Sequence, residues 1–174
     1  MKGELQAQIP QLKKKLLRFD QYAGKSMEEI FTKDQLKDAL VLSVEQAQTS
    51  AFINEGTGNF TLMPLPVMAQ IAPVYGVLVK DINNDGIKDI LLAGNFFGLK
   101  PQTGRFDASY GTTLFGDEKH NFHYAGQSIS GLLVKGEARD IATVESAAGG
   151  EYIVVSVNNE KLCLFMKKSK QQVK

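Results

Sequence analysis

The sequence contains no tryptophan and only one cysteine in 174 residues. That cysteine, Cys163, excludes an intrachain disulfide, and its apolar neighbours Leu162 and Leu164 are typical of a packing residue rather than a nucleophile. The 20 basic residues nearly balance the 19 acidic ones, and the net charge of +1 predicts no bulk attraction to nucleic acid or to a membrane surface. No apolar run approaches the length of a membrane span, so we expect no direct membrane insertion.

The first residues also lack the apolar stretch of a signal peptide, because Met1 is followed by Lys, Gly, Glu, Leu and Gln. Two explanations stay open. Either the protein is cytoplasmic, or the chain is a piece of a longer exported protein.

Motifs for catalysis are missing as well. No Gly-Lys-Ser/Thr or GxGxxG spacing predicts a phosphate-binding loop, and no serine has the context of a nucleophile elbow. His120 and His123 are close enough in sequence to share a metal, but no cysteine or further histidine joins them, so we expect exposed turn residues. We therefore expect no catalytic residue and no enzymatic activity.

The long polar segment 94–111 is the one stretch that weakly indicates a ligand-binding or catalytic loop. Its residues Arg105, Asp107 and Tyr110 are candidate ligand-binding residues, and a hydrolase using this loop is the least favoured alternative. The phenylalanines of the segment are suited to stacking on a sugar ring, although they are equally suited to packing the loop against the core.

The most informative stretch runs from Asp81 to Asp89. Asp81, Asn83, Asp85 and Asp89 place side-chain oxygens at the first, third, fifth and ninth positions of a loop, with a glycine at the sixth. Hard cations such as Ca²⁺ take six to eight oxygen ligands, and glycine permits the sharp turn that such a loop requires. The backbone carbonyl of Ile87 completes the predicted Ca²⁺ site.

This loop departs from an EF-hand in two ways. The twelfth position, where an EF-hand has a bidentate glutamate, is Leu92, and the loop leads into a short apolar run that predicts a buried strand instead of a helix. The alternative is a hairpin turn rich in Asn, Asp and Gly that binds no metal.

The chain changes character near residue 38, and we expect a helical segment over 1–38 and a β-rich region over 39–174. Leu5, Ile9, Leu12, Leu16 and Phe19 form a helical stripe with Pro10 in its first turn. Two capping boxes beginning at Ser26 and Thr32 predict two short helices.

Beyond residue 38, short apolar runs alternate with Gly, Asn and Asp, which predicts an all-β architecture built of hairpins. The hairpin around residues 51–60 repeats around residues 113–122, and repeats of this kind are typical of propellers and solenoids. The expected strands are Leu40–Glu45, Ser50–Asn54, Asn59–Met63, Val74–Lys80, Ile87–Ala93, Gly111–Phe115, Asn121–Ala125, Ala138–Val144, Glu151–Val157 and Lys161–Met166.

The run from Val79 to Asn95, a strand followed by a DxNxDGxxD loop and a second strand, resembles the FG-GAP/VCBS repeat of integrin α-subunit propellers and of secreted bacterial proteins. More narrowly, the stretches 65–75 and 104–111 resemble the C-terminal part of large bacterial proteins related to the ASPIC/UnbV and cartilage acidic protein group. The resemblance implies a partial β-propeller of about two and a half four-stranded blades, preceded by a short helical segment. A third blade would lack the acidic loop, because Gly136–Asp140 has no DxNxDG pattern.

The resemblance further implies Ca²⁺ as the cofactor, the remaining blades of a longer parent chain as partners, and an exported location at the bacterial surface or in the periplasm. Three functions stay open at this point. They are a calcium-stabilised, non-enzymatic segment for binding or adhesion to a glycan or protein ligand, a carbohydrate-binding component of a glycan-processing system, and the loop hydrolase.

Overall fold

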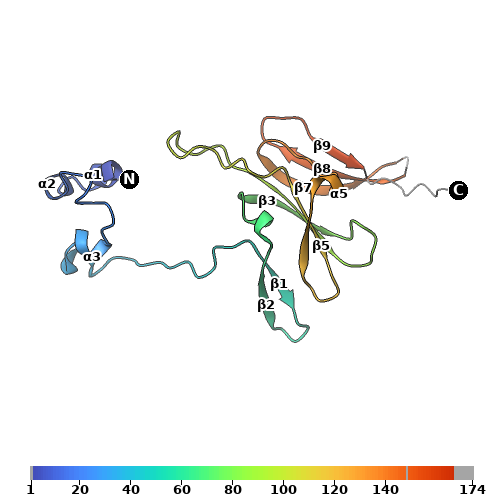
Figure 1. Cartoon of the computed structure of the whole chain (residues 1–174), viewed down its shortest axis with the longest axis horizontal. Helices are drawn as coiled ribbons and strands as arrows, with labels where there is room; N and C mark the ends of the chain where they lie inside the picture. The colour runs from blue at the N-terminus through green and yellow to red at the C-terminus, as the bar shows by residue number, and fades with distance from the viewer. Residues whose placement is uncertain (1, 148, 167–174) are drawn as a thin grey trace. The chain divides into compact units, whose positions relative to one another are not determined.

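The computed structural model describes residues 2–147 and 149–166, and the chain forms two compact units, Met1–Gln46 and Ala47–Lys174 (Figure 1). It is mainly β, with three small antiparallel sheets and a few short helices. No sheet closes into a ring among the described residues. The first unit contains the helices α1 (Lys2–Gln8), α2 (Leu12–Lys15), α3 (Met27–Ile30) and α4 (Lys33–Leu36). The second contains β1 (Ser50–Asn54), β2 (Phe60–Pro64), the 3₁₀ helix η1 (Val67–Ala69), β3 (Val74–Lys80), β4 (Asp89–Gly94), β5 (Thr112–Gly116), β6 (Phe122–Ala125), α5 (Gln127–Ser130), β7 (Ala138–Glu145), β8 (Glu151–Val157) and β9 (Cys163–Met166).

The N-terminal stripe does not form one continuous helix. Helix α1 ends at Gln8, and α2 begins only at Leu12, because Pro10 disfavours helical geometry at the residue before it. The prediction of a single helix with Pro10 in its first turn is therefore wrong. The stripe still faces one small core, in which Leu12 and Leu16 are buried against Ile30.

Both predicted capping boxes are confirmed. Ser26 precedes α3 and donates its backbone N–H to Glu29 at 2.8 Å, while Thr32 precedes α4 and donates its own to Gln35 at 2.9 Å. Each box satisfies backbone donors that a one-turn helix leaves without an intrahelical partner.

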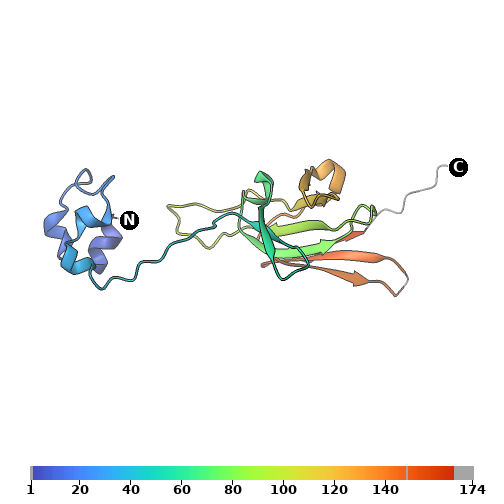
Figure 2. The ribbon, with the colours of Figure 1, turned by 90° about the horizontal axis from the view of Figure 1, so that it is seen from below.

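The second unit contains a two-stranded sheet, β1-β2, a four-stranded sheet, β3-β4-β5-β6, and a three-stranded sheet, β7-β8-β9. Strand β4 is buried along its whole length. On one face of β4, Leu91 and Ala93 belong to a core shared with the β7–β9 sheet, and on the other Ile90 and Leu92 pack with Leu65 from the segment after β2. The β3–β6 sheet therefore packs on the β7–β9 sheet with one face and on the segment after β2 with the other, and Figure 2 shows the green strands of the first sheet above the orange strands of the second.

Glycines allow the layers to approach one another. A Cβ at Gly76 of β3 would lie 2.9 Å from the backbone of Asp140 in β7, so these two strands are close only because no side chain intervenes. A Cβ at Gly94 would overlap the Pro73 carbonyl oxygen at 1.8 Å. Such close backbone approach is one of the uses of glycine inside strands.

Most of the expected strands are present, with ends displaced by up to two residues, but Leu40–Glu45 is not a strand. Its apolar composition favours β structure, yet no backbone hydrogen bond found among the described residues involves it. A strand requires a partner, and composition alone does not supply one. A second correction concerns the region beyond residue 38, which we expected to be all-β, because it also contains η1 and α5 as single helical turns.

Candidate metal-binding loop and its surroundings

The acidic loop connects the adjacent antiparallel strands β3 and β4, as the sequence predicted. Two residues in it have left-handed backbone geometry, Asn84 with a φ of 62° and Gly86 with a φ of 88°. Asparagine and glycine are the residues that adopt this geometry most readily, so the loop can turn tightly between Lys80 and Asp89.

Side-chain oxygens organise the loop from within. One carboxylate oxygen of Asp81 accepts the N–H of Asn84 at 2.7 Å, and its other oxygen accepts the N–H of Gly86 at 3.0 Å. Asp85 accepts the N–H of Ile87 at 2.8 Å. These bonds turn the loop amides toward the carboxylates and fold the loop around its acidic side chains.

Asn83 belongs to the same arrangement. Its amide oxygen accepts the N–H of Asp85 at 2.9 Å, and its amide nitrogen donates to the carboxylate of Asp85 at 2.7 Å. Asx turns of this kind are common in loops that contain Asn and Asp, and they occur with or without a metal.

Asp89, the last of the predicted ligands, is fully buried. One of its oxygens accepts the N–H of Ile82 at 2.7 Å and that of Asn83 at 3.3 Å, and the other accepts the N–H of Gly116 at 3.0 Å. Asp89 therefore ties both ends of the loop to β5. The close approach of Gly116 is possible only for glycine, because a Cβ there would lie 2.3 Å from the carbonyl oxygen of Lys88.

The donor chemistry of the loop fits Ca²⁺, because three carboxylates, an amide oxygen and the Ile87 carbonyl are all hard oxygen ligands. Both carboxylate oxygens of Asp85 and one of Asp89 accept one hydrogen bond each, and a carboxylate oxygen can accept more than one. Across residues 2–147 and 149–166, however, no three Asp, Glu, His or Cys side chains are gathered as around a metal ion. Coordination would therefore require Asp81, Asp85 and Asp89 to turn toward a common point.

A solvent-open depression of about 390 Å³ adjoins the loop, and Asp85 and Ile87 line it together with Asp117 and Glu118. Asp117 organises the β5–β6 turn. Hydrogen bonds from the Asn121 side chain and from His123 hold the pKa of its carboxyl well below the usual range. His123 contacts Asp117 at 3.0 Å, and both histidines are exposed.

The weaker candidate residues lie on the segment between β4 and β5, which folds into a narrow loop closed by a bridge between Phe96 and Phe106. The guanidinium of Arg105 lies 4.8 Å from the ring centre of Phe97. Asp107 is exposed, and Tyr110 is 46% exposed. No hydrogen bond or ion pair among the described residues joins Arg105, Asp107 and Tyr110, so the structure does not bring them together as one site.

Sequence reasoning missed the polar network at the base of this loop. The buried Glu137 accepts the N–H of Phe97 at 2.6 Å, the side chain of Asn158 at 2.9 Å and that of Arg139 at 2.8 Å. The Asn158 amide and then the Phe97 N–H lower the pKa of the Glu137 carboxyl. Asn95, also buried, exchanges hydrogen bonds with Ser109 and donates to the Gly136 carbonyl. Apart from Arg139, which is two residues from Glu137, these partners are 14 to 41 residues apart, so no local motif signals the network.

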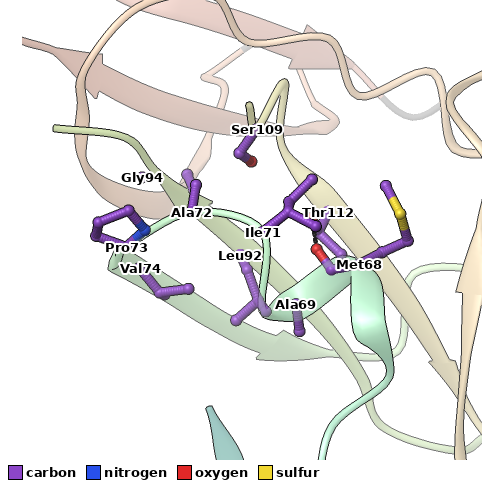
Figure 3. Close-up of a pocket in the computed structure, with 11 residues that line it drawn as sticks. Met68, Ala69, Ile71, Ala72, Pro73, Val74, Leu92, Gly94, Ser109 and Thr112 are labelled. Carbon is purple, nitrogen blue, oxygen red and sulfur yellow. Dashed lines mark hydrogen bonds between the residues drawn. The ribbon is translucent and has the colours of Figure 1, made fainter. Parts of the chain in front are cut away.

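A small cavity lies under the segment that connects β2 to β3 (Figure 3). Its walls are mostly apolar, and Thr112 at one side donates its hydroxyl to the Met68 carbonyl at 3.1 Å. The cavity measures about 10 Å³, which is roughly the space of one water molecule. Binding sites for small organic ligands are about 300–1,000 Å³, so this cavity is a packing defect.

The acidic hairpin and the strands around it can now be compared with known families. Residues 31–92 match the model of the FG-GAP-like repeat family. The match ends within β4 and covers 62 of the 174 residues, and it supports the FG-GAP part of the resemblance. Neither the curated proteins nor the solved structures gave a match. Among the described helices, none is long and apolar enough to cross a membrane.

Proposed function

We propose that this chain is a non-enzymatic, calcium-stabilised segment of a β-propeller-type protein, and that it contributes to binding or adhesion at a bacterial cell surface. The observation that carries the proposal is the all-oxygen loop between β3 and β4, inside a four-stranded antiparallel sheet whose first two strands lie largely within the FG-GAP-like match. Asp81, Asn83, Asp85, Asp89 and the Ile87 carbonyl would hold the cation, which would neutralise three nearby carboxylates.

Further blades of a longer parent chain are the partners that we infer. Support comes from the outer face of the β7–β9 sheet, where Val144, Leu164 and Met166 are 52%, 64% and 64% exposed. Apolar side chains on a sheet face ordinarily pack against a second layer. The packing of the β3–β6 sheet on the β7–β9 sheet shows the form that such a layer would take. We also propose a location outside the cytoplasm, because Ca²⁺ is abundant there and extracellular Ca²⁺ sites work with low affinity.

Calorimetry with excess Ca²⁺, with excess Mg²⁺ and with EDTA tests the metal. A cation that binds only the folded protein stabilises it by about 2.7 kcal/mol at a hundredfold excess over Kd. We expect a higher Tm in Ca²⁺ only, and no difference for Asp85→Ala. The matched control is Asp107→Ala, which removes an exposed carboxylate outside the loop and should keep the rise in Tm with Ca²⁺. Identical melting of the wild-type protein in Ca²⁺ and EDTA would contradict the proposal.

A carbohydrate is the second candidate ligand class, favoured by aromatic exposure on the loop between β4 and β5. Phe106 and Tyr110 are both 46% exposed, and the guanidinium of Arg105 lies 4.8 Å from the ring centre of Phe97 in the same loop. A glycan array with wild-type protein and with Phe106→Ser separates this ligand class from a protein ligand. Hydrolysis of glycosidase, esterase or phosphatase substrates that disappears with Asp107→Ala would instead establish the enzyme that we do not expect.

A further inference from the structure

The helical unit divides its charge unevenly between two halves of its sequence. Residues 2–19, which contain α1 and α2, have five basic residues and one acidic residue. Residues 20–46, which contain α3 and α4, have three basic residues and six acidic ones. Figure 1 shows α1 and α2 side by side and α3 apart from them. The net charge of +1 for the whole chain therefore does not describe the side of this unit that α1 and α2 form.

Two exposed apolar side chains, Leu17 and Phe19, belong to the basic half. They are 72% and 73% exposed, whereas the adjacent Leu16 is buried in the core of the unit. Side chains of α1 hold this segment, because Lys2 donates to the Leu17 carbonyl at 2.8 Å and Gln6 donates to the Leu16 carbonyl at 2.7 Å. The ammonium of Lys2 also lies 5.1 Å from the ring centre of Phe19. A backbone fixed by hydrogen bonds therefore displays both apolar side chains.

Two lysines of α2, Lys13 and Lys14, are free cations. Both are exposed, and among the described residues neither has a hydrogen bond or an ion pair. The other basic residues nearby have partners, since Arg18 pairs with Asp20 at 2.9 Å and Lys15 donates to a backbone carbonyl of α3. The two unpaired cations precede the exposed apolar pair by about one helical turn.

We propose that residues 13–19 dock the helical unit on an anionic lipid surface. Lys13 and Lys14 would lie at the lipid headgroups, and Leu17 and Phe19 would enter the boundary between headgroups and acyl chains. Basic side chains beside exposed aliphatic and aromatic ones are typical of segments that lie in a membrane interface, where apolar burial and attraction to anionic lipids act together. This docking is shallow and requires no membrane-spanning segment. It would hold the chain at a surface, and it does not depend on what the sheets or the acidic loop bind.

Two other occupants fit these residues less well. A protein partner, such as the acidic half of a second copy, would have to cover the lysines, and lysine is depleted in protein interfaces. Nucleic acid would attract the lysines through its phosphates but has no apolar layer for Leu17. A lipid surface combines negative headgroups with an apolar layer directly beneath them.

Sedimentation of the full chain with lipid vesicles tests the charges. We expect binding to vesicles that contain phosphatidylglycerol, weaker binding to phosphatidylcholine alone, and a loss of binding in about 1 M salt, where the screening length is roughly 3 Å. Lys13→Gln together with Lys14→Gln should weaken binding roughly 30-fold, because each lysine near an anionic surface contributes about fivefold. The matched control is Lys33→Gln together with Lys37→Gln, which changes the net charge equally in the acidic half and should keep most of the binding.

The absence of tryptophan from the chain allows a second readout, the depth of docking. Phe19→Trp places a single indole in the apolar pair, and the control Phe52→Trp places one on β1, where the phenylalanine is 69% exposed. With phosphatidylglycerol vesicles we expect a blue shift of the emission, and quenching by lipids brominated in their acyl chains, for Phe19→Trp only.

Several results would overturn the proposal. They are an absence of binding to anionic vesicles, an equal loss of binding in the two lysine pairs, and a blue shift in both tryptophan variants or in neither. A blue shift of Phe19→Trp that appears without vesicles as the protein concentration rises would show that a second copy covers this surface instead. Binding to a single-stranded oligonucleotide as tight as binding to the vesicles would show that the lysines recognise phosphate without a lipid layer.

Discussion

The β3–β6 and β7–β9 sheets each bury one carboxylate, and the two carboxylates are held in different ways. Asp89 of the first sheet is fully buried and accepts hydrogen bonds from backbone N–H groups alone. Glu137, immediately before the second sheet, is 9% exposed and accepts one backbone N–H and two side-chain donors. The first closes a loop next to it in sequence, and the second joins segments far apart.

The difference shows which part of the molecule depends on backbone geometry and which on side chains. The backbone donors of Ile82, Asn83 and Gly116 remain in place when Asp89 is replaced, so its loss leaves these half-buried groups without their acceptor. The donors to Glu137 include the side chains of Arg139 and Asn158, which can turn toward water when their acceptor is changed. We therefore expect the loop around Asp89 to be the less tolerant of the two.

Asp89→Ala should have the largest effect. It removes the acceptor of three amide groups, those of the half-buried residues Ile82, Asn83 and Gly116. Hydrogen bonds to a charged group contribute about 1.5–3 kcal/mol, so we expect the free energy of unfolding to fall by about 3 kcal/mol. Urea denaturation should be followed in EDTA, which separates this effect from any bound cation.

The matched control for that change is Asp140→Ala. Asp140 is an exposed carboxylate on β7 that accepts the N–H of its neighbour Ile141 at 2.8 Å. Its loss should change stability by less than about 0.5 kcal/mol, as is usual for a surface substitution. Equal costs for the two variants would show that Asp89 does not organise the loop.

Gly116→Ala tests the hydrogen bond between Gly116 and Asp89 by changing the donor residue instead of the acceptor. The added Cβ would lie 2.3 Å from the Lys88 carbonyl, and relief of that overlap moves the N–H that Asp89 accepts. Overpacking of this kind costs about 1–3 kcal/mol. Gly126→Ala, where the nearest atom would be the Ser128 hydroxyl at 3.9 Å, should be close to neutral in the same thermal unfolding assay. A Gly116→Ala protein as stable as Gly126→Ala would mean that β5 is not held against the loop.

Asp89 and Glu137 also show which contacts of this protein can be predicted from the sequence alone and which cannot. The DxNxDGxxD spacing placed Asp89 at the end of a loop between two strands, because all of its partners except Gly116 are close in sequence. Nothing near Glu137 indicates that Phe97 is its partner, since 40 residues separate them. The same limit explains why Leu40–Glu45 was expected to be a strand. Local composition predicts a tendency, whereas pairing and long-range hydrogen bonds depend on which segments the fold brings together.

Glu137→Gln should have a smaller effect, one that depends on pH. The folded pKa of Glu137 lies below its ordinary value of 4.5, so its ionised form contributes stability that is present above that value. This contribution is lost as the pH falls through the lowered pKa. The Tm of the wild-type protein should therefore fall more steeply below pH 4.5 than that of Glu137→Gln. Parallel Tm profiles for the two proteins would show that Glu137 binds no fewer protons in the folded state.

Glu151→Ala should have the smallest effect, although Glu151 begins β8 in the position that Asp89 occupies at the start of β4. Glu151 forms an ion pair with Lys80 of β3, and the two side chains are 34% and 36% exposed. Exposed pairs of this kind contribute about 0–1 kcal/mol, because solvent screens the attraction and two long side chains lose freedom. A double-mutant cycle with Lys80→Ala isolates the pair, and its coupling should disappear in about 1 M salt, where the screening length is roughly 3 Å. Coupling that survives high salt would mean that this carboxylate anchors the β7–β9 sheet as Asp89 anchors the β3–β6 sheet.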